Sequence, residues 1–133
     1  MDAAQLLNTH FRTIRVDPQA WRALFAADAV LEMPFAPAHI PRTLKGIDAI
    51  AESVTGFFNQ FDDEFYINVK KIYRVEDDDA AMAEFSVTAT VIPTGKVYNQ
   101  DYILYLRAEN GKIVLYREYF DSSRITAAFT PDN

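Results

Sequence analysis

The sequence contains no cysteine among its 133 residues. Disulfide bridges, thiolate nucleophiles and the usual cysteine-ligated zinc sites are therefore excluded. Histidine is almost as scarce, since His10 and His39 are the only two, so one chain cannot build a metal centre from several imidazoles. We therefore expect neither a metal nor a cofactor, and the lack of cysteine favours a cytoplasmic protein.

Long apolar runs and basic clusters are missing as well. No apolar stretch approaches the roughly 18 residues of a membrane span, and the N-terminus MDAAQLLNTH lacks the basic start and apolar block of a signal peptide. The formal net charge is -6 and the pI about 4.8, which disfavours nucleic acid as a partner. No glycine-rich phosphate loop is present, so no nucleotide is implied.

What remains is apolar and aromatic: 50% of the residues are hydrophobic and 14% aromatic, enough for the core of one domain over residues 1–133. Three helices are expected in the first half. Asp2 with Gln5 predicts a capping box, and Asp17 before Pro18 marks a second start. After a short strand, AVLEMPF, and a loop, APAHIPRTLKG, the third helix is predicted from an apolar stripe of Ile47, Ile50, Val54, Phe57, Phe58 and Phe61.

The second half shows the alternation of β-strands. EFSVTATV alternates cleanly, whereas EFYINVKKIYRVE changes phase at Lys70-Lys71, which predicts a bulge. KVYNQDYILYLR and IVLYREYFD follow, separated by a turn. Helices followed by meandering antiparallel strands predict a single α+β domain.

The turn at Asn110-Gly111 predicts a two-residue hairpin that places Glu109 opposite Lys112. Continued along the strands, this register gives the last hairpin two faces. One face carries Asp101, Ile103, Tyr105, Tyr116, Glu118 and Phe120, and the other carries Tyr102, Leu104, Leu106, Ile113, Leu115, Arg117 and Tyr119. Because both faces are apolar, helices should cover one and a second subunit the other, so we expect a homodimer built on Tyr102, Leu104, Leu115 and Tyr119.

On this register Glu118 lies diagonally across from Asp101, and such neighbours are about 7–8 Å apart at Cα. Two carboxylates among aromatic side chains repel each other and resist ionisation, which is typical of an acid–base pair. Two structural alternatives stay open. Asp101 belongs to the polar stretch YNQD and could simply face water, and Glu118 could be tied to an arginine.

Three stretches together, WRALFAADAVLEMPF, LKGIDAI and YNQDYILYLRAENGKIVLYREYFD, resemble the nuclear transport factor 2-like superfamily. The nearest branch is the SnoaL-like one, among polyketide cyclase, ketosteroid isomerase and phenazine biosynthesis A/B relatives. The resemblance implies a cone-shaped, curved antiparallel sheet wrapped around three N-terminal helices, with an internal pocket. It places Tyr116, Glu118 and Phe120 on the pocket side.

The departures from the family pattern concern the catalytic residues of ketosteroid isomerases. The position of their aspartate base, before Pro-Phe, holds Met33, and the position of their second acid holds Ile103. Their catalytic tyrosine falls near His10. Steroid isomerase chemistry by that constellation is therefore not expected. The phenazine A/B proteins carry an acid in a similar RE-aromatic stretch, so Glu118 carries over as a candidate acid–base residue.

The remaining candidates are His10, predicted either as a buried histidine bonded to a backbone carbonyl or as a pocket acid or base, and His39, in the loop expected at the pocket mouth. The predicted pocket lining comprises Tyr105, Tyr116, Phe120, Ile103, Met33, Phe35, Trp21, Phe58 and His39.

The resulting hypothesis is cofactor-independent acid–base chemistry, isomerase- or cyclase-like, on an apolar carbonyl compound. Glu118 would move the proton, with Asp101 tuning it or His10 opposing it. The alternative is a non-catalytic domain that binds a metabolite or acts as a scaffold.

Overall fold

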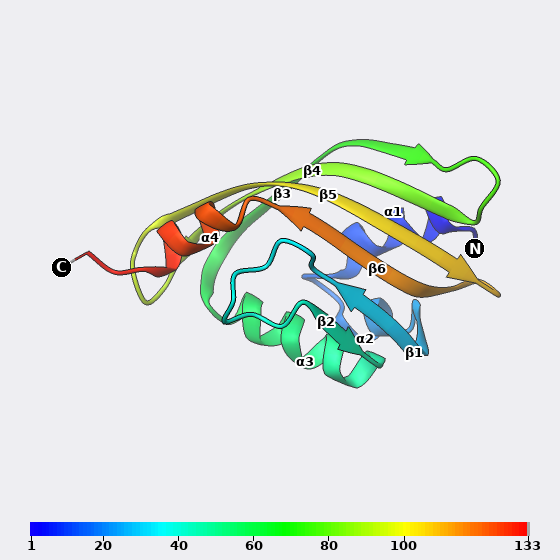
Figure 1. Cartoon of the computed structure of the whole chain (residues 1–133), viewed down its shortest axis with the longest axis horizontal. Coiled ribbons are helices and arrows are strands. Elements are labelled where there is room, and N and C mark those ends of the chain that lie inside the picture. Colours follow the sequence, from blue (N-terminus) through cyan, green and yellow to red (C-terminus); the bar gives the residue numbers. More distant parts are fainter. Residues whose placement is uncertain (133) are drawn as a thin grey trace.

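The computed structural model describes residues 1–132 (Figure 1). Its elements run in the order α1 (Ala3–Thr13), α2 (Pro18–Arg22), β1 (Phe25–Glu32), β2 (Thr43–Lys45), α3 (Ile47–Phe58), β3 (Phe61–Arg74), β4 (Ala80–Val91), β5 (Val97–Glu109), β6 (Lys112–Phe120) and α4 (Ser122–Phe129). The predicted α+β class is confirmed.

The N-terminal helices begin where the sequence predicts. The Asp2 carboxylate accepts a hydrogen bond from the Gln5 backbone N–H at 2.9 Å, and the Gln5 side chain accepts one from the Asp2 N–H at 2.9 Å, which completes the capping box. Asp17 caps α2 in the same way through the Ala20 N–H at 3.1 Å, with Pro18 in the first turn.

Three elements differ from the sequence-based expectation. Helix α3 ends at Phe58, and Phe61 begins β3, although its ring still packs on Phe57 with centroids 4.9 Å apart. The loop after β1 contains the short strand β2, which pairs with β1 through Leu31 and Leu44. Helix α4 was not predicted, and it is capped by Asp121.

The six strands form one sheet in the order β2-β1-β6-β5-β4-β3. All neighbours are antiparallel except β1 and β6, which run parallel. The sheet is therefore mostly antiparallel, as predicted, and its one parallel pair arises because β1 lies beside a strand that follows it much later in the chain. In Figure 1 the long strands β3 to β6 curve, with α1 on one side of the sheet and α3 beside β1 and β2.

The strand pairing shifts register at four places in the described sheet, and two of these shifts bear on the sequence predictions. The predicted one is confirmed at Lys70, since Val69 lies opposite Phe85 but Lys71 lies opposite Glu84. The second was not predicted and lies in the last hairpin. Ala108 faces Ile113 as the turn requires, but the next residue, Arg107, faces Leu115. Val114 therefore has no partner, and every later pair in β6 is displaced by one residue.

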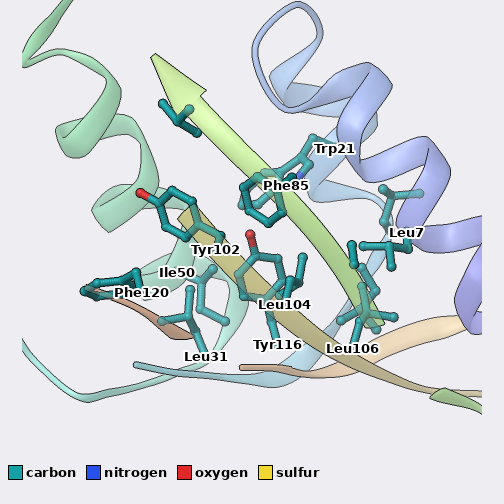
Figure 2. Packing of buried hydrophobic residues seen from close by; sticks show 14 of the residues in the cluster. Leu7, Trp21, Leu31, Ile50, Phe85, Tyr102, Leu104, Leu106, Tyr116 and Phe120 are labelled. Carbon is teal, nitrogen blue, oxygen red and sulfur yellow. The ribbon is translucent and has the colours of Figure 1, made fainter. Parts of the chain in front are cut away.

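The core fills the space between the concave sheet face and the helices. Figure 2 shows side chains from α1, α2, α3 and four strands converging there, namely Leu7, Trp21, Leu31, Ile50, Phe85, Tyr102, Leu104, Leu106, Tyr116 and Phe120. Tyr102 and Leu104, predicted to form a dimer surface, are 7% and 0% exposed inside this core, so that part of the prediction is wrong. No helix within residues 1–132 is long and apolar enough to cross a membrane.

Candidate active site

A cavity of about 140 Å³ lies between the curved sheet, α1 and α3. Its walls are almost wholly apolar. Phenylalanine dominates, and the polar side chains are confined to a few positions. The lining residues are His10, Phe11, Ile14, Leu31, Met33, Ile40, Ser53, Val54, Phe57, Phe58, Phe65, Ile67, Phe85, Val87, Tyr102, Tyr116, Glu118, Phe120 and Ile125.

Glu118 is the only carboxylic acid among these lining residues. It reaches the cavity together with Tyr116 and Phe120, so the predicted pocket side of β6 agrees with the structure. The predicted partners across the hairpin are wrong. Because Val114 adds one residue, Glu118 lies opposite Leu104 and not opposite Ile103.

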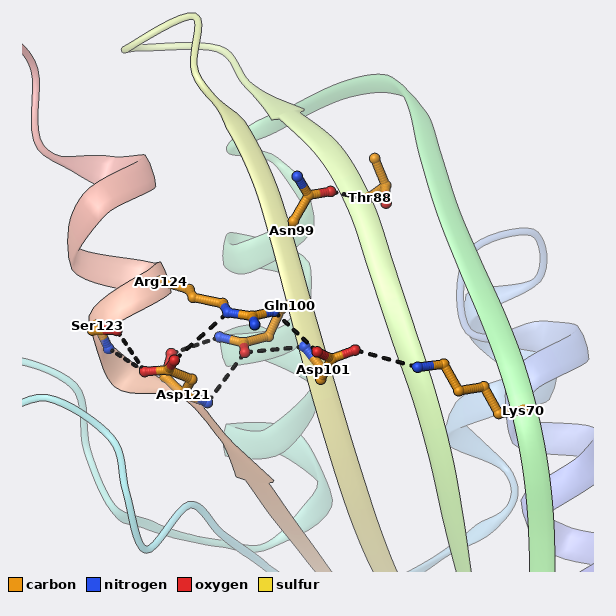
Figure 3. Close-up of polar contacts among 8 residues, drawn as sticks. All are labelled: Lys70, Thr88, Asn99, Gln100, Asp101, Asp121, Ser123 and Arg124. Atoms are coloured by element: carbon orange, nitrogen blue, oxygen red, sulfur yellow. Dashed lines mark hydrogen bonds and ion pairs between the residues drawn. The ribbon is translucent and has the colours of Figure 1, made fainter.

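The same displacement separates Asp101 from Glu118. Asp101 lies on the outer face, where its carboxylate contacts Lys70 Nζ at 3.4 Å and an Arg124 guanidinium nitrogen at 3.1 Å (Figure 3). The predicted diagonal carboxylate pair therefore does not exist, and the alternative of a solvent-facing Asp101 is correct. Asp101 cannot tune Glu118 by direct contact.

The electrostatics of Glu118 depend on its burial. Desolvation in the apolar cavity raises the pKa of its carboxyl group to about 7, and a hydrogen bond donated by the Tyr116 hydroxyl to Oε2 at 3.3 Å opposes this rise. No arginine or lysine within residues 1–132 forms an ion pair with Glu118. Arg117 points to the outer face, 3.4 Å from Glu32 Oε1.

His10 lies on the α1 face that borders the cavity, and it is 1% exposed. Its Nδ1 accepts a hydrogen bond from Trp21 Nε1 at 2.8 Å, and its Nε2 lies 3.4 Å from the Tyr116 hydroxyl. Burial lowers the pKa of His10 to about 3, so the ring is neutral near pH 7. Its partners are side chains, which corrects the predicted bond to a backbone carbonyl.

The other predicted lining residues divide into two groups. Met33 and Phe58 line the cavity, and Trp21 lies behind His10. The remaining four lie outside it. Ile103 and Phe35 are 42% and 58% exposed, His39 is exposed in the loop, and Tyr105 lies under the Arg117 guanidinium.

Sequence reasoning missed much of the aromatic wall. Phe85 and Tyr102 stack with ring centroids 4.8 Å apart, and the Tyr102 hydroxyl lies 2.6 Å from that of Tyr98. The alternation in β4 had identified the buried side of Phe85. The same signal could have found Tyr102, had the hairpin register not assigned it to the outer face.

This architecture, a curved sheet that encloses an apolar cavity beside N-terminal helices, defines a nuclear transport factor 2-like domain. A structure of a nuclear transport factor 2-like protein from Burkholderia thailandensis aligns over 98% of this chain and 99% of its own, with a TM-score of 0.83 and 20% identity. Residues 6–116 match the SnoaL-like domain, and the chain belongs to that family.

Relatives from two bacteria are similar over most of their length. The uncharacterized protein YesE of Bacillus subtilis is 32% identical over 113 residues, which cover 85% of this chain and 76% of YesE. An uncharacterized PhzA/B-like protein of Pseudomonas aeruginosa is 28% identical over 127 residues, with 93% and 87% covered. A Bacillus subtilis protein provisionally assigned as an isomerase superimposes with a TM-score of 0.85 and 29% identity, covering 96% and 91%.

Two structures of lower identity contain small molecules. A Catenulispora acidiphila protein with a ketosteroid isomerase-like fold was solved with trimethylamine, at a TM-score of 0.77 and 17% identity, covering 98% and 95%. A Mycobacterium tuberculosis protein was solved with estradiol-17β-hemisuccinate. It aligns with a TM-score of 0.78 and 16% identity, over 93% of this chain and 98% of its own. At these identities the likeness shows the fold alone.

Proposed function

We propose that the cavity binds a small, largely apolar carbonyl compound and that Glu118 exchanges a proton with it without a cofactor. The observation that carries this proposal is a single carboxyl group in a largely apolar cavity, where burial raises its pKa to about 7. A carboxyl group at that pKa is present in both protonation states near neutral pH. It can therefore act as base and acid within one turnover.

The chemistry follows from the two states of Glu118. The ionised carboxylate accepts a proton from the carbon next to the carbonyl group, and the electron pair of the broken C–H bond forms an enolate. The carboxylic acid so produced then returns the proton to another atom of the same molecule. Isomerisation, cyclisation and condensation all begin with such a step, and the phenylalanine-rich walls keep water away from the enolate.

The family supports this class of function without specifying the reaction. One relative is provisionally assigned as an isomerase and another is PhzA/B-like. The constellation of ketosteroid isomerases is not reproduced, because Met33 and Ile103 occupy the positions that the resemblance assigns to its acids, and Ile103 lies on the outer face. A cytoplasmic location also stays a prediction, from the lack of cysteine.

The second candidate is a binding domain without chemistry. The observation that favours it is the aromatic wall around one carboxylate, an arrangement that also binds amine cations. The trimethylamine bound in the relative with the ketosteroid isomerase-like fold agrees with such a ligand. A bound amine cation should lower the pKa of Glu118, because it stabilises the carboxylate. A neutral carbonyl compound that accepts a hydrogen bond from the protonated carboxyl group should raise that pKa.

The test is a thermal-stabilisation screen of aromatic and polyketide-like carbonyl compounds, with small tertiary amines as a parallel set. Each hit is then assayed for turnover with the wild type and with Glu118→Gln, which keeps the shape of the side chain. For an enzyme, we expect Glu118→Gln to lose at least ~10²-fold in turnover with ligand binding little changed.

The matched control is Glu84→Gln. Glu84 also accepts a hydrogen bond from a tyrosine hydroxyl, that of Tyr73, but on the exposed outer face. Full activity of Glu118→Gln on a turned-over compound would exclude Glu118 as the acid–base residue. Hits that bind but never react would favour the binding domain.

A further inference from the structure

Four side chains from three elements form one hydrogen-bonded series that ends in the cavity. Trp21 of α2 contacts His10 of α1 at 2.8 Å, His10 contacts Tyr116 of β6 at 3.4 Å, and Tyr116 contacts Glu118 at 3.3 Å. The first three residues are 4%, 1% and 5% exposed, and the structure leaves no buried side-chain nitrogen or oxygen unpaired within residues 1–132.

The direction of every bond in this series follows from its first member. An indole nitrogen carries a hydrogen and cannot accept, so Nδ1 of His10 must be the acceptor. A neutral imidazole has one N–H group, which must then be at Nε2. Nε2 therefore donates to the Tyr116 oxygen, and the hydroxyl hydrogen of Tyr116 is left to point at Oε2 of Glu118.

The surroundings contain few groups that could reverse this order. The titratable side chains facing Glu118 are His10 from α1, Tyr116 from its own strand, and the Tyr98–Tyr102 pair from β5. The Tyr98 and Tyr102 hydroxyls bond each other at 2.6 Å. The lining residues of β1, β3, β4, α3 and α4 carry no charge.

We infer that Trp21 and His10 are positioning residues, which hold the Tyr116 hydroxyl with its hydrogen toward Oε2 of Glu118 and leave Oε1 as the oxygen that exchanges the proton with the ligand. This inference rests on the proposed function of Glu118. It deepens that proposal by naming which carboxyl oxygen reacts and which residues, far apart in the sequence, fix its orientation.

The distances indicate which hydrogen bonds of the series should shorten when a ligand binds. The bond from Trp21 has an ordinary length. The His10–Tyr116 bond, at 3.4 Å, and the Tyr116–Glu118 bond, at 3.3 Å, are longer than the usual ranges of about 2.7–3.2 Å for N–H···O and about 2.5–3.0 Å for O–H···O. Catalytic hydrogen bonds are often long without ligand and shorten in the complex. A ligand that increases the negative charge on Glu118 should therefore draw the Tyr116 hydroxyl closer.

The chain has features that make the first test direct. It contains one tryptophan and two histidines, so the Trp21 indole signal is unique, and the His10 ring nitrogens are assigned by comparison with His39→Gln. We expect ¹⁵N shifts of the ligand-free protein to show His10 as the neutral Nε2–H tautomer at pH 7. In Trp21→Phe the ring should become a mixture of tautomers, because Nδ1 has lost its donor.

The second test follows the Glu118 carboxyl carbon by ¹³C NMR, with Glu118→Gln used for assignment. Trp21→Phe and Tyr116→Phe should each raise the pKa of Glu118 by about half a unit or more, since a net hydrogen bond is worth about 1 kcal/mol and one pKa unit 1.36 kcal/mol. His10→Leu should raise it also. His10→Gln, whose amide can donate to Tyr116 in place of Nε2, should restore most of the wild-type value.

The control is Tyr119→Phe, which removes a hydroxyl from the same strand on the outer face, where Tyr119 packs on Phe35. It should leave the Glu118 titration unchanged. The inference is overturned if His10 carries its hydrogen on Nδ1, or if Trp21→Phe and His10→Leu leave the pKa of Glu118 at the wild-type value. A Glu118 that titrates near 4.5 in the wild type would instead remove the basis of the proposed function, so the two failures are distinguishable.

Discussion

Glu118 and His10 titrate abnormally for the same reason and in opposite directions. Burial disfavours the charged form of each, which raises the pKa of Glu118 from 4.5 to about 7 and lowers that of His10 from 6.5 to about 3. At pH values between about 3 and 7 both groups are therefore predominantly neutral, and they share one apolar space, joined through Tyr116.

These shifts should give opposite contributions to stability. Glu118 releases its proton more readily in the unfolded chain, so its contribution to the free energy of unfolding falls as pH rises from 4.5 to about 7. His10 takes up a proton more readily in the unfolded chain, so its contribution falls as pH drops from 6.5 toward 3. Between pH 4.5 and 6.5 the two contributions to the free energy of unfolding change with pH in opposite directions and largely cancel.

Removing one of the two groups should reveal the pH dependence of stability that the other contributes. In Glu118→Gln, stability should fall on acidification from pH 6.5 to 4.5 relative to the wild type, by up to about 1.4 kcal/mol per pH unit. In His10→Leu, stability should instead fall as pH rises over the same range. Urea denaturation at three pH values measures both, and the double variant should restore the flat profile. Wild-type-like pH profiles in both single variants would contradict the assigned shifts.

At the scale of elements, α2 is a five-residue helix that holds Trp21 against His10. A helix this short is not stable alone, and its formation depends on its cap and on tertiary packing. Asp17 supplies the cap through the Ala20 N–H, and Trp21 packs edge-to-face on Phe25 with centroids 4.8 Å apart.

Removing the cap should therefore destabilise the protein. We predict that Asp17→Ala lowers the free energy of unfolding by about 0.5–2 kcal/mol, the usual cost of losing an N-cap, and broadens the Trp21 indole signal. Asp17→Asn keeps an acceptor oxygen and should behave like the wild type. Urea denaturation and an indole ¹H–¹⁵N spectrum measure both effects, and equal losses in the two variants would show that charge, not capping, matters at this position.

The elements also show what the sequence could predict. Caps and alternation are local, so α1, α2 and the buried side of β4 followed directly from residues such as Asp2, Asp17 and Phe85. The β5–β6 register did not follow, because both faces of that hairpin carry apolar residues and alternation cannot choose between registers. The parallel pairing of β1 with β6 is a long-range choice that neither strand encodes alone.

At the scale of the whole molecule, the outer sheet face remains the candidate dimer surface. Because of the bulge, this face carries Ile103 and Tyr105 of β5 together with Leu115 and Tyr119 of β6. Ile103 is 42% exposed in the middle of this face, between the Arg117–Glu32 and Asp101–Lys70 ion pairs. An apolar centre with a charged rim is typical of a protein–protein interface.

We predict a homodimer in solution that buries at least ~1,000 Å² in total. Ile103→Glu, which places a charge at the centre of the face, should shift the molar mass measured by light scattering at micromolar concentration to that of the monomer. Ile92→Glu is the control, because Ile92 is 60% exposed and follows the end of β4. A monomeric wild type would refute the prediction.

Val114 has a consequence for comparing relatives of this protein. Side chains alternate along a strand, so one residue more or less between the Asn110-Gly111 turn and Glu118 moves the acid from the cavity to the outer face. Two homologues can thus share the same Arg-Glu-aromatic sequence while the glutamate of one points into the cavity and that of the other points to the outer face. An alignment that opens a gap in this hairpin would equate residues on opposite sides of the sheet, and transferring a catalytic role along it requires counting from the turn.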